Sequence, residues 1–315
     1  MMKRVIGTVA VVLAVVLAAV VGGSCYMLDY ALAPDGNRTD ADSCYRMLFR
    51  DYPETRQWVD SLQACHALRD TFVTMAGGYR CHAYYINRGS RRTALVIHGW
   101  RDQAIKFFYL ARIYERLLGY NVVAPDLYAS GKSDGEAIRM GWLDREDMLR
   151  WIEVFRTDTM VVHGVSMGGA TTMMLSGERM PAGIKDVRFV DDCGYSSVWD
   201  EFGGQLKEQF GLPAFPLLYT TSVLCKWRYE WSFAEASAVE QVKKCRYPML
   251  FIHGDRDAFV PTRMVYQLYE AKRGEKVLWI TDSTDHALSY KNHREEYVRR
   301  VGAFVEGTRC SEMLK

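Results

Sequence analysis

The chain has 315 residues, 49% of them hydrophobic and 25% charged, which is enough for one large buried core and ordinary for a globular protein. Its net charge is +2, and the Lys and Arg residues are scattered in single positions and short pairs. These features exclude a basic stripe that could follow a phosphate backbone, so nucleic acid is not expected as a partner.

Residues 1–30 form the predicted transmembrane or signal segment. The run from Val5 to Gly23 carries no charge and is built almost entirely from Val, Ala, Leu, Ile and Gly. A helix that spans a bilayer needs about 20 such residues. Lys3 and Arg4 precede the run and aspartates follow it, so the positive-inside rule places the N-terminus in the cytoplasm and the rest outside.

Three interpretations of this segment stay open. An uncleaved signal anchor is favoured, because the apolar run exceeds a usual signal core and no A-x-A cleavage site closes it. The second is a cleaved secretory signal. The third is a lipoprotein signal lipidated at Cys25, although the usual Leu three residues earlier is replaced by Gly22. All three predict export, with the domain anchored on the extracytoplasmic side, or secreted or lipid-linked if the segment is cleaved.

The eight cysteines do not predict a metal site. They are Cys25, Cys44, Cys65, Cys81, Cys193, Cys225, Cys245 and Cys310, and no C-x-x-C pair or zinc-like Cys/His spacing occurs among them. Export makes one or two disulfides feasible. Their pairing stays open.

Two regions follow the apolar segment. Residues 31–75 are interpreted as a leader that packs on the domain, with helical stretches at Ser43–Phe49 and Glu54–Leu68. In residues 76–315, short apolar runs alternate with helical patterns, which predicts βαβ units and a mostly parallel, doubly wound sheet. The predicted strands are Arg80–Ile86, Thr93–Ile97, Asn121–Ala124, Thr159–His163, Val187–Asp191, Met249–Ile252 and Lys276–Ile280. The predicted helices are Ile105–Leu118, Trp142–Phe155, Gly168–Glu178, Thr262–Lys272 and His293–Glu306.

One connection is far longer than a simple crossover needs. About 194–246 is rich in aromatic residues and is interpreted as an inserted, mostly helical lid. These aromatic side chains favour an apolar or aromatic acyl substrate, although packing of the lid on the core would explain them equally well.

The sequence Gly164-Val165-Ser166-Met167-Gly168 follows a predicted strand and opens a predicted helix. A serine on such a tight turn presents its hydroxyl above the sheet, and the flanking glycines relieve the crowding. Ser166 is therefore the predicted nucleophile, with Gly164 and Gly168 as the glycines of the turn.

A nucleophilic serine needs a base and a residue that orients the base. His286 lies in a loop directly after the last predicted strand, so it is preferred over His293, which sits in a charged helical stretch. Asp257 lies in the loop after the strand Met249–Ile252. It is preferred over Asp255, which is placed to satisfy local N–H groups, while Asp191 and Asp192 are the reserve.

The predicted oxyanion hole uses two backbone N–H groups. One belongs to Met167, immediately after the nucleophile, and the other to Trp100, in the loop that follows the strand Thr93–Ile97. Gly99 permits the close approach of that loop. His98-Gly99 could also be no more than the end of a strand.

With these motifs in order, the chain resembles the α/β-hydrolase superfamily, and within it exported or membrane-anchored bacterial proteins that are esterase-like or serine-aminopeptidase-like and carry a lid. The resemblance rests on residues 98–100, 164–169, 253–261 and 285–286. It implies Ser166, Asp257 and His286 as the triad, with no metal or organic cofactor. The stretch Asp126–Ser133 departs from the family's usual turn, because Arg, Gly and His are replaced. In the family this turn helps to shape the floor of the pocket.

The predicted activity is hydrolysis of a carboxylic ester through an acyl-enzyme. The first alternative is a peptidase or amidase on the same triad, which would need a polar or acidic group in the pocket to hold an amine. The second is a catalytically silent, membrane-tethered binding module, against which the intact triad argues.

Overall fold

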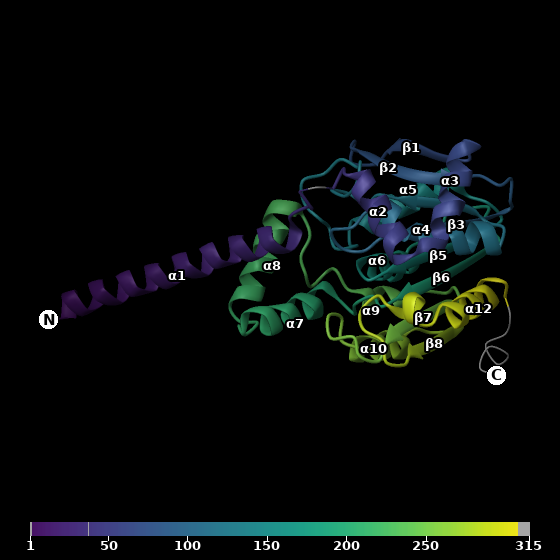
Figure 1. Ribbon diagram of the computed structural model, residues 1–315. Coiled ribbons are helices and arrows are strands. Elements are labelled where there is room, and N and C mark those ends of the chain that lie inside the picture. The colour runs from purple at the N-terminus through teal and green to yellow at the C-terminus, as the bar shows by residue number, and fades with distance from the viewer. Residues whose placement is uncertain (1, 37, 308–315) are drawn as a thin grey trace.

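The computed structural model describes residues 2–36 and 38–307. An eight-stranded sheet of order β1-β2-β4-β3-β5-β6-β7-β8 forms its centre (Figure 1). All pairings from β4 to β8 are parallel, whereas β1 and β2 pair antiparallel with their neighbours. The strands are β1 Leu68–Thr74, β2 Arg80–Ile86, β3 Arg92–Ile97, β4 Asn121–Pro125, β5 Thr159–Val165, β6 Asp186–Asp192, β7 Met249–Gly254 and β8 Lys276–Thr281.

All seven predicted strands are present; the bounds of β2 are as predicted, and those of the others differ by one or two residues at one or both ends. Strand β1 was not predicted, because its sequence Leu-Arg-Asp-Thr-Phe-Val-Thr has no continuous apolar run and its burial pattern is that of an exposed edge. The sheet therefore begins at Leu68, within the segment expected to be the leader.

Helices cover both faces of the sheet. Their bounds are α1 Met2–Leu32, α2 Ala41–Asp51, α3 Arg56–Ala64, α4 Phe108–Arg112, α5 Asp144–Phe155, α6 Met167–Ser176, α7 Val198–Phe210, α8 Leu217–Tyr229, α9 Ala238–Val242, α10 Arg263–Ala271, α11 Ser289–Asn292 and α12 Arg294–Val305. Short 3₁₀ turns at Pro53–Thr55 and Ala104–Phe107 and a π-helical turn at Ile113–Leu117 complete them.

Alternate residues of the strands enter two different cores. In β3, Leu95 and Ile97 face the core shared with α5, α6 and α10, while Ala94 and Val96 face the core shared with α2, α3 and α12. The strands are thus apolar on both faces, as a parallel sheet between two helical layers requires. The fold is that of an α/β hydrolase, as predicted.

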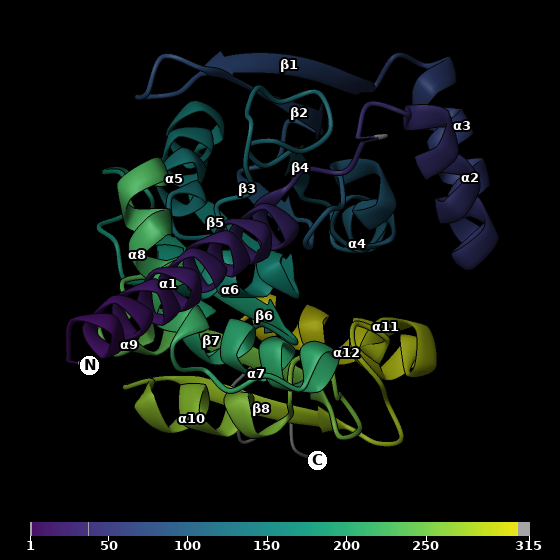
Figure 2. The same cartoon turned by 90° about the vertical axis from the view of Figure 1, so that its left-hand side faces the viewer.

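The long connection between β6 and β7 contains α7, α8 and α9, which agrees with the interpretation of an inserted helical lid. Helices α7 and α8 stand at one end of the sheet, beside the end of α1 (Figures 1 and 2). Ser24 Oγ and Thr220 Oγ1 lie 2.6 Å apart at the crossing of α1 with α8. Tyr30 donates a hydrogen bond of 3.0 Å to Gln209 of α7.

The N-terminal part of α1 projects away from the rest of the molecule (Figure 1). Arg4–Leu32 is long and apolar enough to cross a membrane, and none of its most apolar 18-residue window is buried. Such a helix is consistent with a membrane anchor or a signal sequence. The cysteines in the described residues are all free thiols, and Cys310 lies outside them.

Candidate active site

Ser166 occupies a sharp turn between β5 and α6, with φ 59° and ψ −120°. The turn tolerates no side chain at its two predicted glycines. A Cβ on Gly164 would lie 1.9 Å from the carbonyl oxygen of Gly168, and a Cβ on Gly168 would lie 2.2 Å from that of Ile97. Those glycines let the strand and the helix approach closely enough to lift the serine hydroxyl above the sheet.

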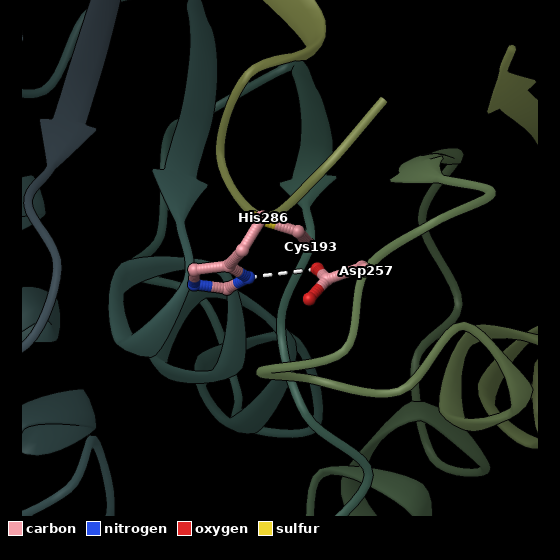
Figure 3. A group of neighbouring side chains, drawn as sticks. All are labelled: Cys193, Asp257 and His286. Atoms are coloured by element: carbon pink, nitrogen blue, oxygen red, sulfur yellow. Dashed lines mark hydrogen bonds and ion pairs between the residues drawn. The ribbon is translucent and has the colours of Figure 1, made fainter. Parts of the chain in front are cut away.

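His286 and Asp257 come to this serine from the loops after β8 and β7. His286 Nε2 lies 2.8 Å from Ser166 Oγ, and its Nδ1 lies 2.7 Å from Asp257 Oδ2. Figure 3 shows the second of these contacts, with the imidazole turned toward the carboxylate. The three residues predicted as a triad therefore form one hydrogen-bonded chain, in the order that nucleophilic catalysis requires.

Asp257 is held by four hydrogen-bond donors. The N–H groups of Phe259 and Val260 donate to Oδ1 at 3.0 and 2.9 Å. Oδ2 receives His286, and His253 Nε2 lies 3.3 Å from it. Burial alone would raise the pKa of Asp257, but hydrogen bonds from His253 and His286 outweigh it and lower the pKa to about 2. The carboxylate is thus ionised at neutral pH and orients the imidazole.

The alternative residues serve other contacts. Asp255 accepts a 3.0 Å bond from the Thr284 N–H and so holds the loop that carries His286. His293 Nε2 lies 2.9 Å from the Asp282 carbonyl. Asp192 accepts a bond from Tyr297, and Asp191 accepts one from the Gly194 N–H.

The loop after β3 lies directly beside Ser166. A Cβ on Gly99 would stand 3.6 Å from Ser166 Cβ, so the backbone of this loop passes close to the serine. Trp100 follows, and its indole N–H donates to the Ala31 carbonyl of α1 at 3.0 Å. Met167 begins α6. Both predicted oxyanion donors therefore belong to backbone that flanks Ser166.

A cavity of about 120 Å³ lies over Ser166, between the sheet edge and the lid. Its wall is mostly apolar. It includes Trp100 and Phe259 near the serine, Phe202 and Phe210 of α7, Leu217 and Leu218 of α8, and Met27, Tyr30 and Ala31 of α1. The contribution of the N-terminal helix was not predicted from the sequence.

A profile of the alpha/beta hydrolase family matches residues 94–300, which is most of the chain and contains the three hydrogen-bonded residues. The chain belongs to the alpha/beta hydrolase family. A Bacillus subtilis (strain 168) relative, the uncharacterized protein YqkD, is 26% identical over 240 residues, which cover 74% of this chain and 78% of that protein.

Solved structures agree with the family. The esterase Pf2001 of Pyrococcus furiosus is 25% identical with a TM-score of 0.59, and the match covers 76% of this chain and 91% of the esterase. A structure described as a bacterial membrane phospholipase A is 17% identical with a TM-score of 0.56, and it covers 98% of this chain and 99% of its own. Because the identity is only 17%, this second match shows a shared fold and nothing more. Its coverage of 98% of this chain means that the matched region extends into α1.

Several hydrogen bonds hold the turn at Asp126–Ser133 in this alpha/beta hydrolase. Asp126 accepts hydrogen bonds from the N–H groups of Ala104 and Lys132 and from His82 Nδ1. Ser133 donates to the Asp126 carbonyl at 2.6 Å. The turn keeps its compact shape although three family residues are replaced.

Strand β5, which leads to Ser166, contains a buried histidine, His163. His163 contacts the hydroxyls of Tyr114 and Tyr297 at 2.9 Å each, and burial lowers its pKa to about 3. His163 is therefore neutral and serves the packing of the core.

Cys193 lies beside Asp257 and His286 (Figure 3), and one ligand atom from each of these three residues lies within 4.8 Å of the others. Burial raises the pKa of the Cys193 thiol well above its usual value, so the sulfur is not a thiolate ligand. His286 and Asp257 are already bonded to each other and to Ser166. The three residues therefore fit a metal ion poorly.

Glu201 is the one carboxyl side chain among the described residues that line the cavity. It is 4% exposed, and its Oε1 accepts a 3.1 Å bond from Gln205. Its Oε2 has no hydrogen-bond partner in the part of the chain that the structure describes. Burial is the main cause that raises its pKa to about 8. At pH 7 Glu201 is thus mostly a neutral acid. The place of Glu201 in the cavity wall was not predicted, because nothing in the sequence distinguishes it from other helical glutamates.

Substituting Glu201 by glutamine is expected to remove a pH dependence of stability. Because the folded pKa is raised from 4.5 to about 8, the neutral acid favours the folded state at low pH, and this advantage is lost as the pH rises through about 8. The wild-type free energy of unfolding should fall by roughly 2–3 kcal/mol between pH 6 and pH 9 from this group alone. Urea titrations at both pH values test this. The exposed Glu240 in α9 provides the control Glu240→Gln, and equal pH slopes for the two variants would contradict the assignment.

Proposed function

We propose that this alpha/beta hydrolase is a serine esterase that cleaves a carboxylic ester with an apolar or aromatic acyl group. The observation that carries the proposal is the hydrogen-bonded chain Ser166–His286–Asp257 beneath an apolar cavity. The likeness to the Pyrococcus furiosus esterase supports it, at 25% identity over 91% of that chain. No metal or organic cofactor enters the proposed reaction.

In the proposed mechanism, His286 Nε2 takes the Ser166 proton as Oγ attacks the ester carbonyl. Asp257, ionised and bonded to Nδ1, keeps the imidazole in the tautomer that accepts this proton and stabilises the imidazolium that forms. His286 then protonates the leaving alcohol, and the acyl group stays on Ser166. Water, deprotonated by the same imidazole, releases the acid and restores the serine.

The backbone N–H groups of Met167 and Trp100 are proposed as the oxyanion donors. Both flank the serine, and α6 directs its N-terminus at the same point. One such donor lowers the barrier by about 2.7–4 kcal/mol.

Glu201 favours a second candidate function, because an acidic group in the pocket is what an amidase or aminopeptidase would use to hold an amine. Its raised pKa argues for the ester. A carboxyl with a pKa of about 8 is mostly protonated at neutral pH, so it donates a hydrogen bond to a carbonyl or ether oxygen more readily than it pairs with a cation.

We also propose that α1 is an uncleaved anchor and that the catalytic domain lies on the extracytoplasmic side. Arg4 stands at the N-terminal end of the apolar run, and Asp29 and Asp35 follow it, as the positive-inside rule requires for this orientation.

A substrate panel tests the choice of bond. The full chain in detergent micelles is expected to hydrolyse p-nitrophenyl esters, with a preference for acyl groups longer than acetyl, and to leave aminoacyl-p-nitroanilides intact. Faster cleavage of the anilides than of the esters would replace the esterase by the peptidase alternative. No turnover of either class would contradict both.

A further inference from the structure

Helix α8 exposes an apolar stripe that the described residues cover only in part, where the ring of Trp199 packs on Tyr219. Tyr219, Val223 and Trp227 are four residues apart and so share one face, and Phe215 extends that face just before the helix begins. Their exposed fractions are 72% for Phe215, 51% for Tyr219, 70% for Val223 and 82% for Trp227. Large side chains this exposed on one face mark a contact surface.

The stripe faces away from the protein body. Leu218, Ser222 and Cys225 lie on the other side of α8 and are buried. A third side of α8 packs against α1. A Cβ on Gly23 of α1 would lie 3.1 Å from Leu217 Cδ2 of α8. Thr220 of α8 contacts Ser24 of α1. Arg228 pairs with Asp29 at 2.8 Å near the end of α8. In Figure 1, α8 runs across α1 at the point where α1 leaves the body.

The length of α1 places this crossing at the edge of a bilayer. From Arg4 to Gly23 the helix has 20 residues, which at 1.5 Å per residue measure about 30 Å, the thickness of a hydrocarbon core. With Arg4 at one boundary, the other boundary falls at Gly23 and Ser24, where α8 packs. Helix α8 therefore begins at this boundary. Its C-terminal end lies farther out, because Arg228 pairs with Asp29, six residues or about 9 Å beyond Gly23.

Trp and Tyr are the side chains that membrane boundaries favour, because a ring with one polar atom suits the headgroup region. The pocket is close to the same level. Met27 is one turn of α1 beyond Gly23, or about 6 Å, and it lines the cavity over Ser166 together with Leu217 and Leu218 of α8.

We propose that the stripe Phe215, Tyr219, Val223 and Trp227 is a second membrane contact, which rests the lid on the bilayer that α1 enters. The contact keeps the cavity over Ser166 beside the lipid, so that an acyl ester dissolved in the bilayer is the substrate that reaches it. The bilayer is the occupant because α8 packs on α1 at the end of its apolar run, where the length of that run places the membrane boundary. The substrate part of the inference rests on the proposed esterase function, whereas the membrane contact does not.

Fluorescence quenching by lipid tests the contact without any enzyme activity. The full chain is placed in phosphatidylcholine vesicles with and without bromine on the acyl chains. Trp227→Phe keeps an aromatic ring but removes the reporter, so the quenched share of tryptophan emission should fall relative to wild type. Trp279→Phe is the control, because Trp279 packs against His293 and Tyr297, and it should leave the quenched emission unchanged. Equal quenching in wild type and Trp227→Phe would overturn the contact.

Activity tests the delivery of substrate. Val223→Ser combined with Trp227→Ser should lower hydrolysis of vesicle-embedded p-nitrophenyl palmitate by about tenfold and leave hydrolysis of water-soluble p-nitrophenyl acetate unchanged. The matched control replaces Val154 and Tyr266, which are 45% and 47% exposed on α5 and α10, by serine.

The outcomes separate the two proposals. Equal palmitate rates in the stripe variant and the control, with acetate still cleaved, would overturn the delivery of substrate from the bilayer. A wild-type chain that cleaves neither ester would overturn the esterase function, while the quenching result would still decide the membrane contact. A dimer in detergent that the stripe variant converts to a monomer, with no quenching of Trp227, would assign the stripe to a second copy of the chain.

Discussion

Replacing Ser166 by alanine is expected to lower hydrolysis of p-nitrophenyl esters by roughly 10⁴–10⁶-fold, because the hydroxyl that forms the acyl-enzyme is removed. The fold should persist. An alanine at this position would keep the backbone conformation of the serine, with φ 59°. Within the described residues, the serine hydroxyl forms a hydrogen bond only with His286, at 2.8 Å. The melting temperature should stay within about 3 °C of wild type. Steady-state kinetics and a thermal melt on the same preparation measure both.

Ser176→Ala is the matched control, since Ser176 ends the same helix that Ser166 precedes and its hydroxyl donates to the Met173 carbonyl, far from His286 in the chain. It should retain wild-type turnover. A Ser166→Ala variant that keeps more than a few percent of the activity would remove Ser166 from the mechanism.

Replacing Asp257 by asparagine is expected to lower kcat by about 10⁴-fold while leaving substrate binding nearly unchanged. The asparagine oxygen satisfies the N–H groups of Phe259 and Val260, so its amide turns toward His286 Nδ1. That contact favours the tautomer with the proton on Nε2, which cannot accept the Ser166 proton. Kinetics at pH 7 measure the effect.

The same change should also alter stability. Since the folded pKa of Asp257 is lowered from 3.8 to about 2, its ionised form stabilises the fold above pH 3.8, and this stabilisation is lost as the pH falls through about 2. The shift is worth roughly 2 kcal/mol at neutral pH, which the asparagine variant should lose.

Asp255→Asn provides the control, because an amide oxygen still accepts the bond from Thr284 that Asp255 makes. Activity close to wild type is expected. If Asp255→Asn lost turnover and Asp257→Asn kept it, the acid of the triad would have to be reassigned to Asp255.

The sheet could be predicted from the sequence because its inner strands are continuous apolar runs. Leu95 and Ile97 enter one core and Ala94 and Val96 the other, so every residue of the run is apolar. Strand β1 was missed because it pairs on one side only and exposes polar residues such as Arg69 and Asp70. Strand β1 forms because it pairs with β2, and the hydrophobic pattern of its own residues does not indicate that pairing.

The serine, histidine and aspartate of the candidate site could be named because each follows a strand in the chain order of this fold. His253 could not, because its contact with Asp257 depends on how the loop folds back after β7. Glu201 and the α1 residues Met27 and Ala31 reach the cavity only through packing of the lid and of the N-terminal helix. Such long-range contacts leave no periodicity in the sequence.

The central claim is that Ser166 is a nucleophile activated by His286, and covalent labelling tests it most directly. The full chain in detergent is treated with a fluorophosphonate, and the modified peptide is located by mass spectrometry. One adduct per chain is expected, on the peptide that contains Ser166, and its rate of formation should fall by at least about a hundredfold in His286→Ala. An adduct at another residue, or no adduct on the folded wild-type chain, would contradict the account.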